Sequence, residues 1–321
     1  MVVTCAVPAN AAVKVVRPPS TPVTKLQPLP VVAKAVPVLP PLTDTAKVGP
    51  LKFSSTILNS ADLTSYAMAV GNQGSVGSCV SWAVDYGMLG WWANKLGILK
   101  PFYSRLTHKV ISYDWLHPMF SFHRIGSATG DTKPDDPYKG EPIRWGSGNK
   151  TALQDAETYG APPSTDYTGA LGTWDYFHEP SLAELASASR YRIKPGSWEA
   201  VFSHDGTKEM SGDEIKALKS QLMAGHPVAL GIRADSLFKA WGNSGSTMGG
   251  NATGVMNGTG ESGNANHAVL ALGYDTSSLL IENSWGTSWG EKGWIRVSWN
   301  WVKMGVKSGY AITSNSPFVT P

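Results

Sequence analysis

The stretch of residues 71–83 constrains the fold more than any other part of this 321-residue chain. It reads Gly-Asn-Gln-Gly-Ser-Val-Gly-Ser-Cys-Val-Ser-Trp-Ala, so a single cysteine, Cys79, stands between a glycine-rich turn and a long apolar segment. From Trp82 to Leu96 the large apolar residues recur at alternating spacings of four and three. This spacing predicts one face of an α-helix that begins close to the cysteine.

Cys79 is predicted to lie in the first turn of this helix, with Ser78 at the N-cap and Gly97 just past the end. Unpaired backbone N–H groups and the helix dipole favour the thiolate there, and the thiolate is the nucleophilic form of cysteine. A small buried cysteine is the alternative interpretation. It would not need the glycine-rich approach or the amide of Gln73, so Cys79 is a candidate nucleophile.

The composition is that of a globular protein, with 42% hydrophobic and 16% charged residues. The net charge of +3 is small and dispersed, which argues against binding to nucleic acid or to an acidic membrane surface. No apolar run approaches the ~20 residues that a membrane span needs. The two cysteines, Cys5 and Cys79, do not make a disulfide framework. This fits a reducing compartment and also a secreted bacterial protein.

Residues 1–55 differ in composition from the rest of the chain. The first fifty residues hold 10 of the 22 prolines, and prolines in such density favour extended polyproline II structure. We therefore expect residues 1–55 to be an extended arm without a core of its own, and residues 56–321 to be the folded domain. The start of the chain lacks the basic region and the longer apolar stretch of a signal peptide.

Helix patterns come first in the chain and strand patterns second. Helices are predicted near residues 79–96, 101–116, 151–159 and 211–224, and short β-strands near 227–233, 267–274, 279–283, 293–299 and 309–313. Residues 126–150 and 248–266 are rich in turn-forming residues and are predicted to be loops. This order indicates an α+β fold with a helical lobe, an antiparallel β lobe and a cleft between them.

His267 and Asn283 are candidates for the partners that a cysteine nucleophile needs. His267 stands at the start of one predicted strand, and Asn283 follows the end of the next, sixteen residues later. A short turn between two antiparallel strands would bring these side chains together, so that the amide could orient the imidazole. The alternative is a structural histidine and a turn asparagine beside the core residues Trp285 and Trp289.

Three blocks of sequence together resemble the papain family of cysteine peptidases. They are Gln-Gly-Ser-Val-Gly-Ser-Cys at 73–79, Asn-His-Ala-Val at 266–269, and Glu-Asn-Ser-Trp-Gly-Thr-Ser-Trp-Gly-Glu-Lys-Gly-Trp at 282–294. The blocks follow one another in the family's order, and the last one is long and highly specific. The resemblance covers roughly residues 60–315 and implies a papain-like two-lobe fold with the active site between the lobes.

The resemblance also implies roles for individual residues. Cys79 would be the nucleophile, His267 its acid/base partner and Asn283 the group that orients the imidazole. Gln73 would donate to the oxyanion together with the Cys79 backbone N–H, and Trp285 would shield the Asn283–His267 contact. The implied reaction is peptide-bond hydrolysis through a thioacyl-enzyme, on an extended polypeptide substrate, without a metal or a cofactor.

The sequence departs from the family pattern at several positions. Val76 stands where the family has a disulfide-bonded cysteine, and a proline-rich arm stands where it has a helical pro-segment, which suggests a bacterial or phage-type branch. We accordingly expect a secreted bacterial or phage-associated protein and not a lysosomal one. The glycines that line the substrate groove are approximated by Gly146, Ser147 and Gly148. Thr313 aligns near the main specificity pocket.

Two other functions remain open from the sequence. One is a papain-fold binding or structural protein without turnover, suggested by the arm and by the Gly/Asn-rich loop before His267. The other is an acyltransferase that uses the same Cys-His-Asn set with an amine acceptor. The arm could lie in the cleft as an internal partner, because polyproline II is already extended, or it could be a plain tether.

Overall fold

The structure is a computed structural model that describes residues 3–4, 49–103, 110–128, 146–169, 171, 178–241 and 254–319. Most of the predicted arm, the greater part of the predicted loop at 126–150 and residues 248–253 of the predicted loop at 248–266 lie outside this range. The division at residue 55 therefore stays a prediction.

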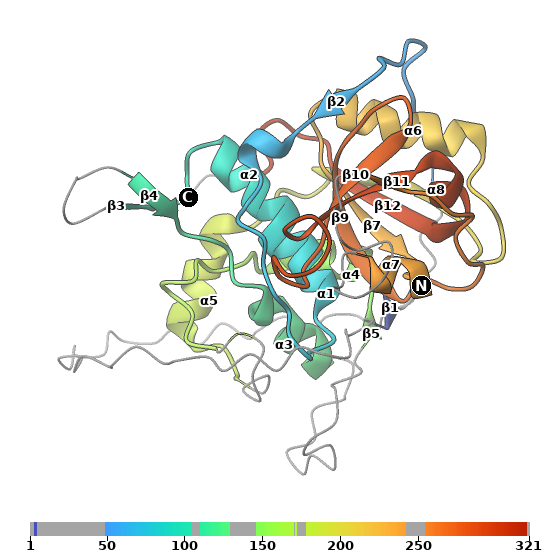
Figure 1. The fold of residues 1–321 in the computed structure, drawn as a ribbon. Helices are drawn as coiled ribbons and strands as arrows, with labels where there is room; N and C mark the ends of the chain where they lie inside the picture. Colours follow the sequence, from blue (N-terminus) through green and yellow to red (C-terminus); the bar gives the residue numbers. More distant parts are fainter. Residues whose placement is uncertain are drawn as a thin grey trace, which may run out of the picture.

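One long helix runs through the middle of the molecule (Figure 1). It comprises α1 (Cys79–Ser81), the π-helical η2 (Trp82–Leu89) and α2 (Gly90–Lys95), and it ends at Gly97, whose φ is +66°. The predicted helix and its terminating glycine are therefore confirmed. The prediction of a single apolar face is wrong for η2, because all eight of its residues are buried. Helices α3 (Pro118–Ala128) and α4 (Asn149–Thr158) pack against the central helix, and so do strands β7 (Val228–Ile232) and β9 (His267–Tyr274).

The rest of the helical lobe only partly follows the sequence prediction. The expected helix at 151–159 is α4 (Asn149–Thr158), closed by Gly160 with a φ of +79°. The expected helix at 101–116 is wrong, since β3 (Pro101–Tyr103) pairs with β4 (Val110–Tyr113). Proline, aromatic and β-branched residues in these runs favour extended backbone. The remaining helical elements are η1 (Thr64–Tyr66), α3 (Pro118–Ala128), α5 (Leu182–Ala188) and η3 (Ser189–Tyr191).

An eight-stranded, mainly antiparallel sheet forms the second lobe within the described residues. The strand order is β6-β12-β7-β9-β10-β11-β8, with β2 beside β9, and only the β11–β8 pair is parallel. All five predicted strands are confirmed, although β12 begins three residues earlier than expected. Their bounds are β2 (Ala61–Asp62), β6 (Trp198–Ser203), β7 (Val228–Ile232), β8 (Val255–Met256), β9 (His267–Tyr274), β10 (Ser278–Glu282), β11 (Trp294–Ser298) and β12 (Val306–Ile312).

Three helices accompany the sheet. The predicted helix after Ser211 is α6 (Gly212–Met223), which packs on β6 and β9. It begins with a capping box, in which the Ser211 hydroxyl accepts the Glu214 N–H and the Glu214 carboxylate accepts the Ser211 N–H. The short helices α7 (Ser236–Ala240) and α8 (Trp299–Gly305) were not expected from the sequence.

Strand β9 joins the two lobes through its alternating side chains, and all eight of its residues are buried. Ala268, Leu270 and Leu272 belong to the core that includes the Cys79 helix. Val269 and Ala271 belong to the core on the other face of the sheet. This alternation follows from the two-residue period of a strand, and it places His267 at the seam between the lobes.

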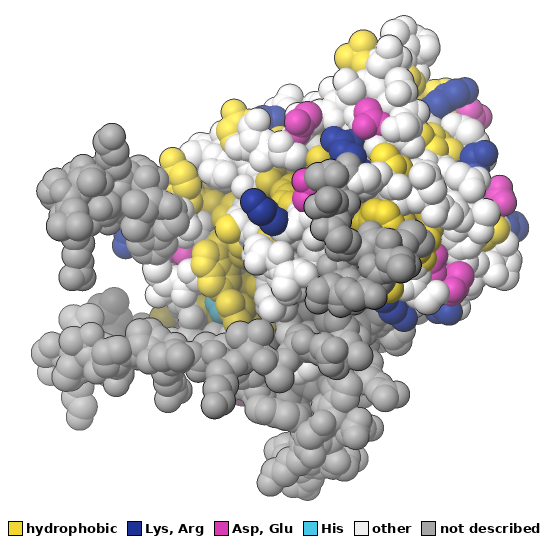
Figure 2. Space-filling view, viewed as in Figure 1, with side chains coloured by type: hydrophobic (Ala, Val, Ile, Leu, Met, Phe, Trp, Pro, Cys, Tyr) yellow, Lys and Arg dark blue, Asp and Glu magenta, His cyan; other side chains and the backbone are white. Residues whose placement is uncertain are grey.

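The surface agrees with the small and dispersed charge of the sequence. On the face seen in Figure 2, Lys and Arg side chains alternate with Asp and Glu over the described residues. None of the described helices is long and apolar enough to cross a lipid bilayer.

Candidate active site

Cys79 lies at the beginning of the central helix and is completely buried. Its Sγ accepts a hydrogen bond from the Ala268 N–H at 3.3 Å, so the sulfur sits against the backbone that follows His267. Ser78 occupies the N-cap position as predicted, but its side chain makes no capping hydrogen bond. The helix N-terminus therefore lacks a side-chain acceptor from its own cap, and its electropositive end is directed at the sulfur.

Cys79 is present as a disulfide in this structure. The chain contains only one other cysteine, Cys5, which lies outside the described residues. The sulfur of Cys79 is therefore in its oxidised state here, and it must be reduced before it can act as a nucleophile.

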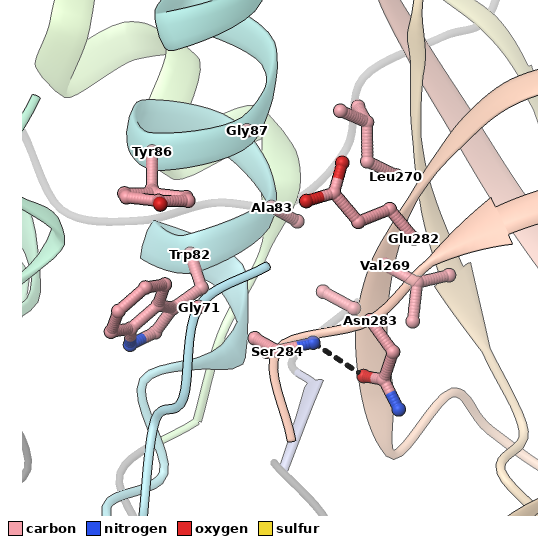
Figure 3. Close-up of a pocket in the computed structure, with 11 residues that line it drawn as sticks. Gly71, Trp82, Ala83, Tyr86, Gly87, Val269, Leu270, Glu282, Asn283 and Ser284 are labelled. Atoms are coloured by element: carbon pink, nitrogen blue, oxygen red, sulfur yellow. Dashed lines mark hydrogen bonds between the residues drawn. The ribbon is translucent and has the colours of Figure 1, made fainter. Parts of the chain in front are cut away.

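His267 and Asn283 are hydrogen bonded, as the strand pattern predicts. His267 Nε2 donates to Asn283 Oδ1 at 2.7 Å, and the Ser284 N–H donates to the same oxygen at 2.8 Å (Figure 3). The hairpin of β9 and β10 brings the two residues together. Because Oδ1 can only accept, the imidazole carries its proton on Nε2. His267 Nδ1 has no hydrogen-bond partner among the described residues, which leaves it available to take a proton.

The His267 imidazole is held in its neutral form. Burial lowers the pKa of His267 to about 4, the hydrogen bond to Asn283 opposes this shift, and the Lys239 ammonium lowers the pKa further. A neutral imidazole with one open nitrogen is the form that can accept a thiol proton.

Aromatic side chains enclose the histidine. The Trp285 ring lies 4.5 Å from the His267 ring, centroid to centroid, and is inclined by only 25° to it. Phe238 contacts both of these rings, and Trp289 contacts Trp285 and Phe238. The indole thus lies where the predicted shielding role requires it, since it keeps water from a buried hydrogen bond.

Gln73 ties the glycine-rich turn to the loop after Asn283. Its backbone N–H donates to the Ser284 carbonyl at 2.8 Å, and its Oε1 accepts the Ser284 hydroxyl at 2.8 Å. Its Nε2 donates to the Val76 carbonyl at 2.9 Å, which uses one of the two amide hydrogens. The second hydrogen is the one that the predicted oxyanion contact would use.

The proposed groove residues lie on the helical lobe. Gly146 and Ser147 form strand β5, and Gly148 is the N-cap of α4, which packs against α1. Thr313 follows β12, where its N–H donates to the Ser197 carbonyl at 2.9 Å. The place of Thr313 in a specificity pocket stays a prediction.

The sequence prediction missed Glu282, which lines a pocket between η2 and strands β9 and β10. Figure 3 shows its carboxyl group directed toward the helix near Ala83. Its Oε2 has no hydrogen-bond partner among the described residues, and burial raises the pKa of Glu282 to about 8. Burial also raises the pKa of Tyr86, and the neighbouring Glu282 carboxylate adds to this rise. The only sequence feature that could have pointed to Glu282 as a site residue is its position next to Asn283.

No group of His, Cys, Asp and Glu side chains in the described part of the chain is arranged to hold a metal ion.

The sequence profile described as "Papain family cysteine protease" matches residues 155–313, a stretch that includes both His267 and Asn283. Over this stretch the chain is similar to the papain family of cysteine proteases. Among curated members of the family, cathepsin K of Gallus gallus is 38% identical over 101 residues, 30% of this chain and 27% of that protein. Papain of Carica papaya is 48% identical over 46 residues, 14% of this chain and 12% of that protein. The chain thus spans less than a third of the length of these relatives.

The family's fold extends over most of the chain. Xylellain, a cysteine protease from Xylella fastidiosa, superposes with a TM-score of 0.56 at 17% identity, covering 81% of this chain and 87% of xylellain. Digestive procathepsin L 3 of the Tenebrio molitor larval midgut superposes with a TM-score of 0.55 at 20% identity. The superposition covers 85% of this chain and 74% of that protein. The predicted papain-like α+β fold is therefore confirmed.

Proposed function

We propose that this chain is a thiol peptidase that hydrolyses peptide bonds of extended polypeptides through a thioacyl-enzyme. The observation that carries the proposal is the geometry around His267. Its Nε2 is held by Asn283 at 2.7 Å, its Nδ1 is open among the described residues, and the Cys79 sulfur lies against the next residue of the strand.

In the proposed reaction, His267 Nδ1 takes the proton of the reduced Cys79 thiol. The thiolate attacks the substrate carbonyl carbon, while the Cys79 N–H and Gln73 Nε2 donate to the oxyanion. The imidazolium then protonates the leaving amine, and water attacks the thioester with His267 as the general base. Asn283 keeps the imidazole oriented throughout, and the reaction needs no metal or cofactor beyond these side chains.

Gly146, Ser147 and Gly148 are the proposed main-chain binding strip for the substrate. Strand β5 pairs antiparallel with another strand of this chain, β1 (Val3–Thr4), and thus has main-chain groups placed for an extended peptide. Trp285 and Thr313 complete the proposed substrate-binding set.

The arm of residues 1–55, ahead of a catalytic domain of residues 56–321, is the proposed internal partner of the groove. The pairing of β1 with β5 supports this assignment. A secreted bacterial or phage-type origin is also proposed, supported by Val76 where the family has a disulfide-bonded cysteine.

A cleavage assay on a fluorogenic peptide library, with dithiothreitol present, tests the function. The wild type should hydrolyse peptides, whereas Cys79→Ala and His267→Ala should lose the activity and keep the fold. His226→Ala is the matched control, because His226 bonds to Gln221 away from the site. Full hydrolysis by Cys79→Ala would refute the proposal, and amide products with an added amine would favour acyl transfer.

A further inference from the structure

We propose that Asp235 is a positioning residue for the reaction: its carboxylate ties helix α7 to helix α8, and through Phe238 it holds the His267 imidazole in its working orientation. This inference rests on the proposed function, because it names a residue that acts on the base of the same site. The connection from Asp235 to the imidazole runs through aromatic side chains, and three observations lead to it.

The first observation is the pair of hydrogen bonds that the buried carboxylate accepts. Asp235 is the N-cap of α7, and its Oδ1 accepts the Phe238 N–H at 2.7 Å. Its Oδ2 accepts the indole N–H of Trp301, in α8, at 2.8 Å. Only 5% of Asp235 is exposed. Both donors are N–H groups, which cannot accept, so each carboxylate oxygen has its own partner. One side chain thus fixes the start of α7 relative to α8, and both helices lie beside the sheet (Figure 1).

The second observation is that Trp301 is a fixed anchor. Its side chain is fully buried, and its backbone N–H donates to the hydroxyl of Ser298, the N-cap of α8. A Cβ at Gly305, the last residue of α8, would lie 2.8 Å from atoms of the Trp301 ring. The indole is therefore packed directly against the backbone of its own helix. It has little room to move, so the bond to Asp235 places α7 against a rigid point.

The third observation is the position of Phe238 between this anchor and the site. The fully buried Phe238 ring stacks on Trp301, with centroids 5.5 Å apart and 19° between the planes. The same ring contacts His267, at 6.3 Å and 62°, and Trp285, at 5.8 Å. Aromatic rings attract one another at such separations. Phe238 is the third residue of the five-residue α7, so a shift at the start of this helix would move the ring.

The consequence concerns the orientation and the protonation of His267. Its Nδ1 must face the Cys79 sulfur, and a small misplacement of a reacting group costs much of the rate. Burial is also the main cause of the low pKa of His267, about 4, and Phe238 and Trp285 supply part of that burial. A looser α7 would admit water to the imidazole and raise this pKa. Departure of the Lys239 ammonium, which is also on α7 and lowers the pKa, would act in the same direction.

Asp235→Asn tests the proposal, because asparagine has almost the same size and still supplies one oxygen. In either orientation of the amide, one of the two N–H donors then faces another N–H. At a temperature where the variant is folded, kcat of the reduced full chain for a fluorogenic peptide should fall about 10-fold, while KM changes by less than about twofold. In an NMR titration the pKa of His267 should rise from about 4 toward 6.5. The His267 signals are identified by their loss in His267→Ala.

Ser211→Ala is the matched control, because the Ser211 hydroxyl caps α6 with the same kind of bond. It should lower the melting temperature and leave both kcat and the His267 pKa unchanged. Trp301→Phe removes the indole N–H but keeps an aromatic ring. The double variant Asp235→Asn/Trp301→Phe should therefore regain part of the kcat that Asp235→Asn loses, because the two donors no longer face each other.

Two results would overturn the proposal. One is an Asp235→Asn variant that is less stable than the wild type but keeps its kcat and its His267 pKa, since Asp235 would then be a helix cap and nothing more. The other is a loss of kcat that simply adds in the double variant. An inactive reduced wild type would instead refute the proposed function. The NMR titration requires no turnover, so it would still decide whether Asp235 positions the imidazole.

Discussion

Replacing Glu282 by glutamine should make the protein more stable at alkaline pH. Burial raises the pKa of Glu282 from 4.5 to about 8. Between these values the folded protein keeps the proton that the unfolded chain has lost, so stability falls as the pH rises through this window. Each pKa unit corresponds to about 1.4 kcal/mol, and the wild type should therefore lose about 5 kcal/mol between pH 4.5 and pH 8.

Glu282→Gln cannot ionise, so this loss should disappear. Because the Glu282 Oε2 has no partner among the described residues, the new amide should cost about 1 kcal/mol at every pH. The variant should be slightly less stable than the wild type at pH 4 and about 4 kcal/mol more stable at pH 9.

Urea unfolding of the oxidised protein at pH 4, 6, 8 and 9, followed by tryptophan fluorescence, measures this difference. Glu209→Gln is the matched control, because Glu209 is exposed and its replacement should leave the pH dependence as it is. If the wild type and Glu282→Gln lost stability in parallel between pH 4.5 and pH 8, the buried carboxyl group would not be the cause and the reasoning would be refuted.

Three further predictions concern the site and its supports. Asn283→Ala removes the acceptor of the His267 Nε2–H, and kcat/KM of the reduced enzyme should fall about 10- to 30-fold, equivalent to about 1–2 kcal/mol. Trp285→Ala admits water to the imidazole, so the pKa of His267 should rise from about 4 toward 6.5 in an NMR titration, because burial is the main cause of the low value. Gly160→Ala should lower the melting temperature far more than Gly97→Ala. Both glycines have positive φ, but a Cβ at 160 would lie 2.1 Å from a carbonyl oxygen, whereas a Cβ at 97 meets nothing within 4 Å.

Each of these predictions has a contradicting outcome. Asn300→Ala removes an exposed amide that donates to the Gly258 carbonyl, and a loss of activity equal to that of Asn283→Ala would mean a general effect on folding. Trp299→Ala removes a ring that contacts Tyr274, and a rise in the His267 pKa equal to that in Trp285→Ala would contradict the role given to Trp285. Equal destabilisation by the two glycine substitutions would show that backbone strain alone matters at these positions.

The parts of the site that the residue pattern could predict are local in sequence. His267 and Asn283 flank a hairpin with a short turn, so the spacing of the two strands was enough to bring them together. The approach of Cys79 to β9 joins residues 189 positions apart, and only the resemblance to the papain family indicated it. No local rule of spacing fixes which strand a distant helix will meet, because tertiary packing decides it.

The burial of Glu282 is a second feature that the sequence pattern could not predict, because it also depends on tertiary packing. Along β10, Leu279 and Ile281 belong to the core on one face of the sheet, and Leu280 is only partly buried on the other. This alternation predicts that Glu282 faces water. It does not, because η2 covers that face at the level of Glu282. Every residue of η2 is buried, so the single apolar face that predicted this helix gave no sign that its other faces also pack against the rest of the protein.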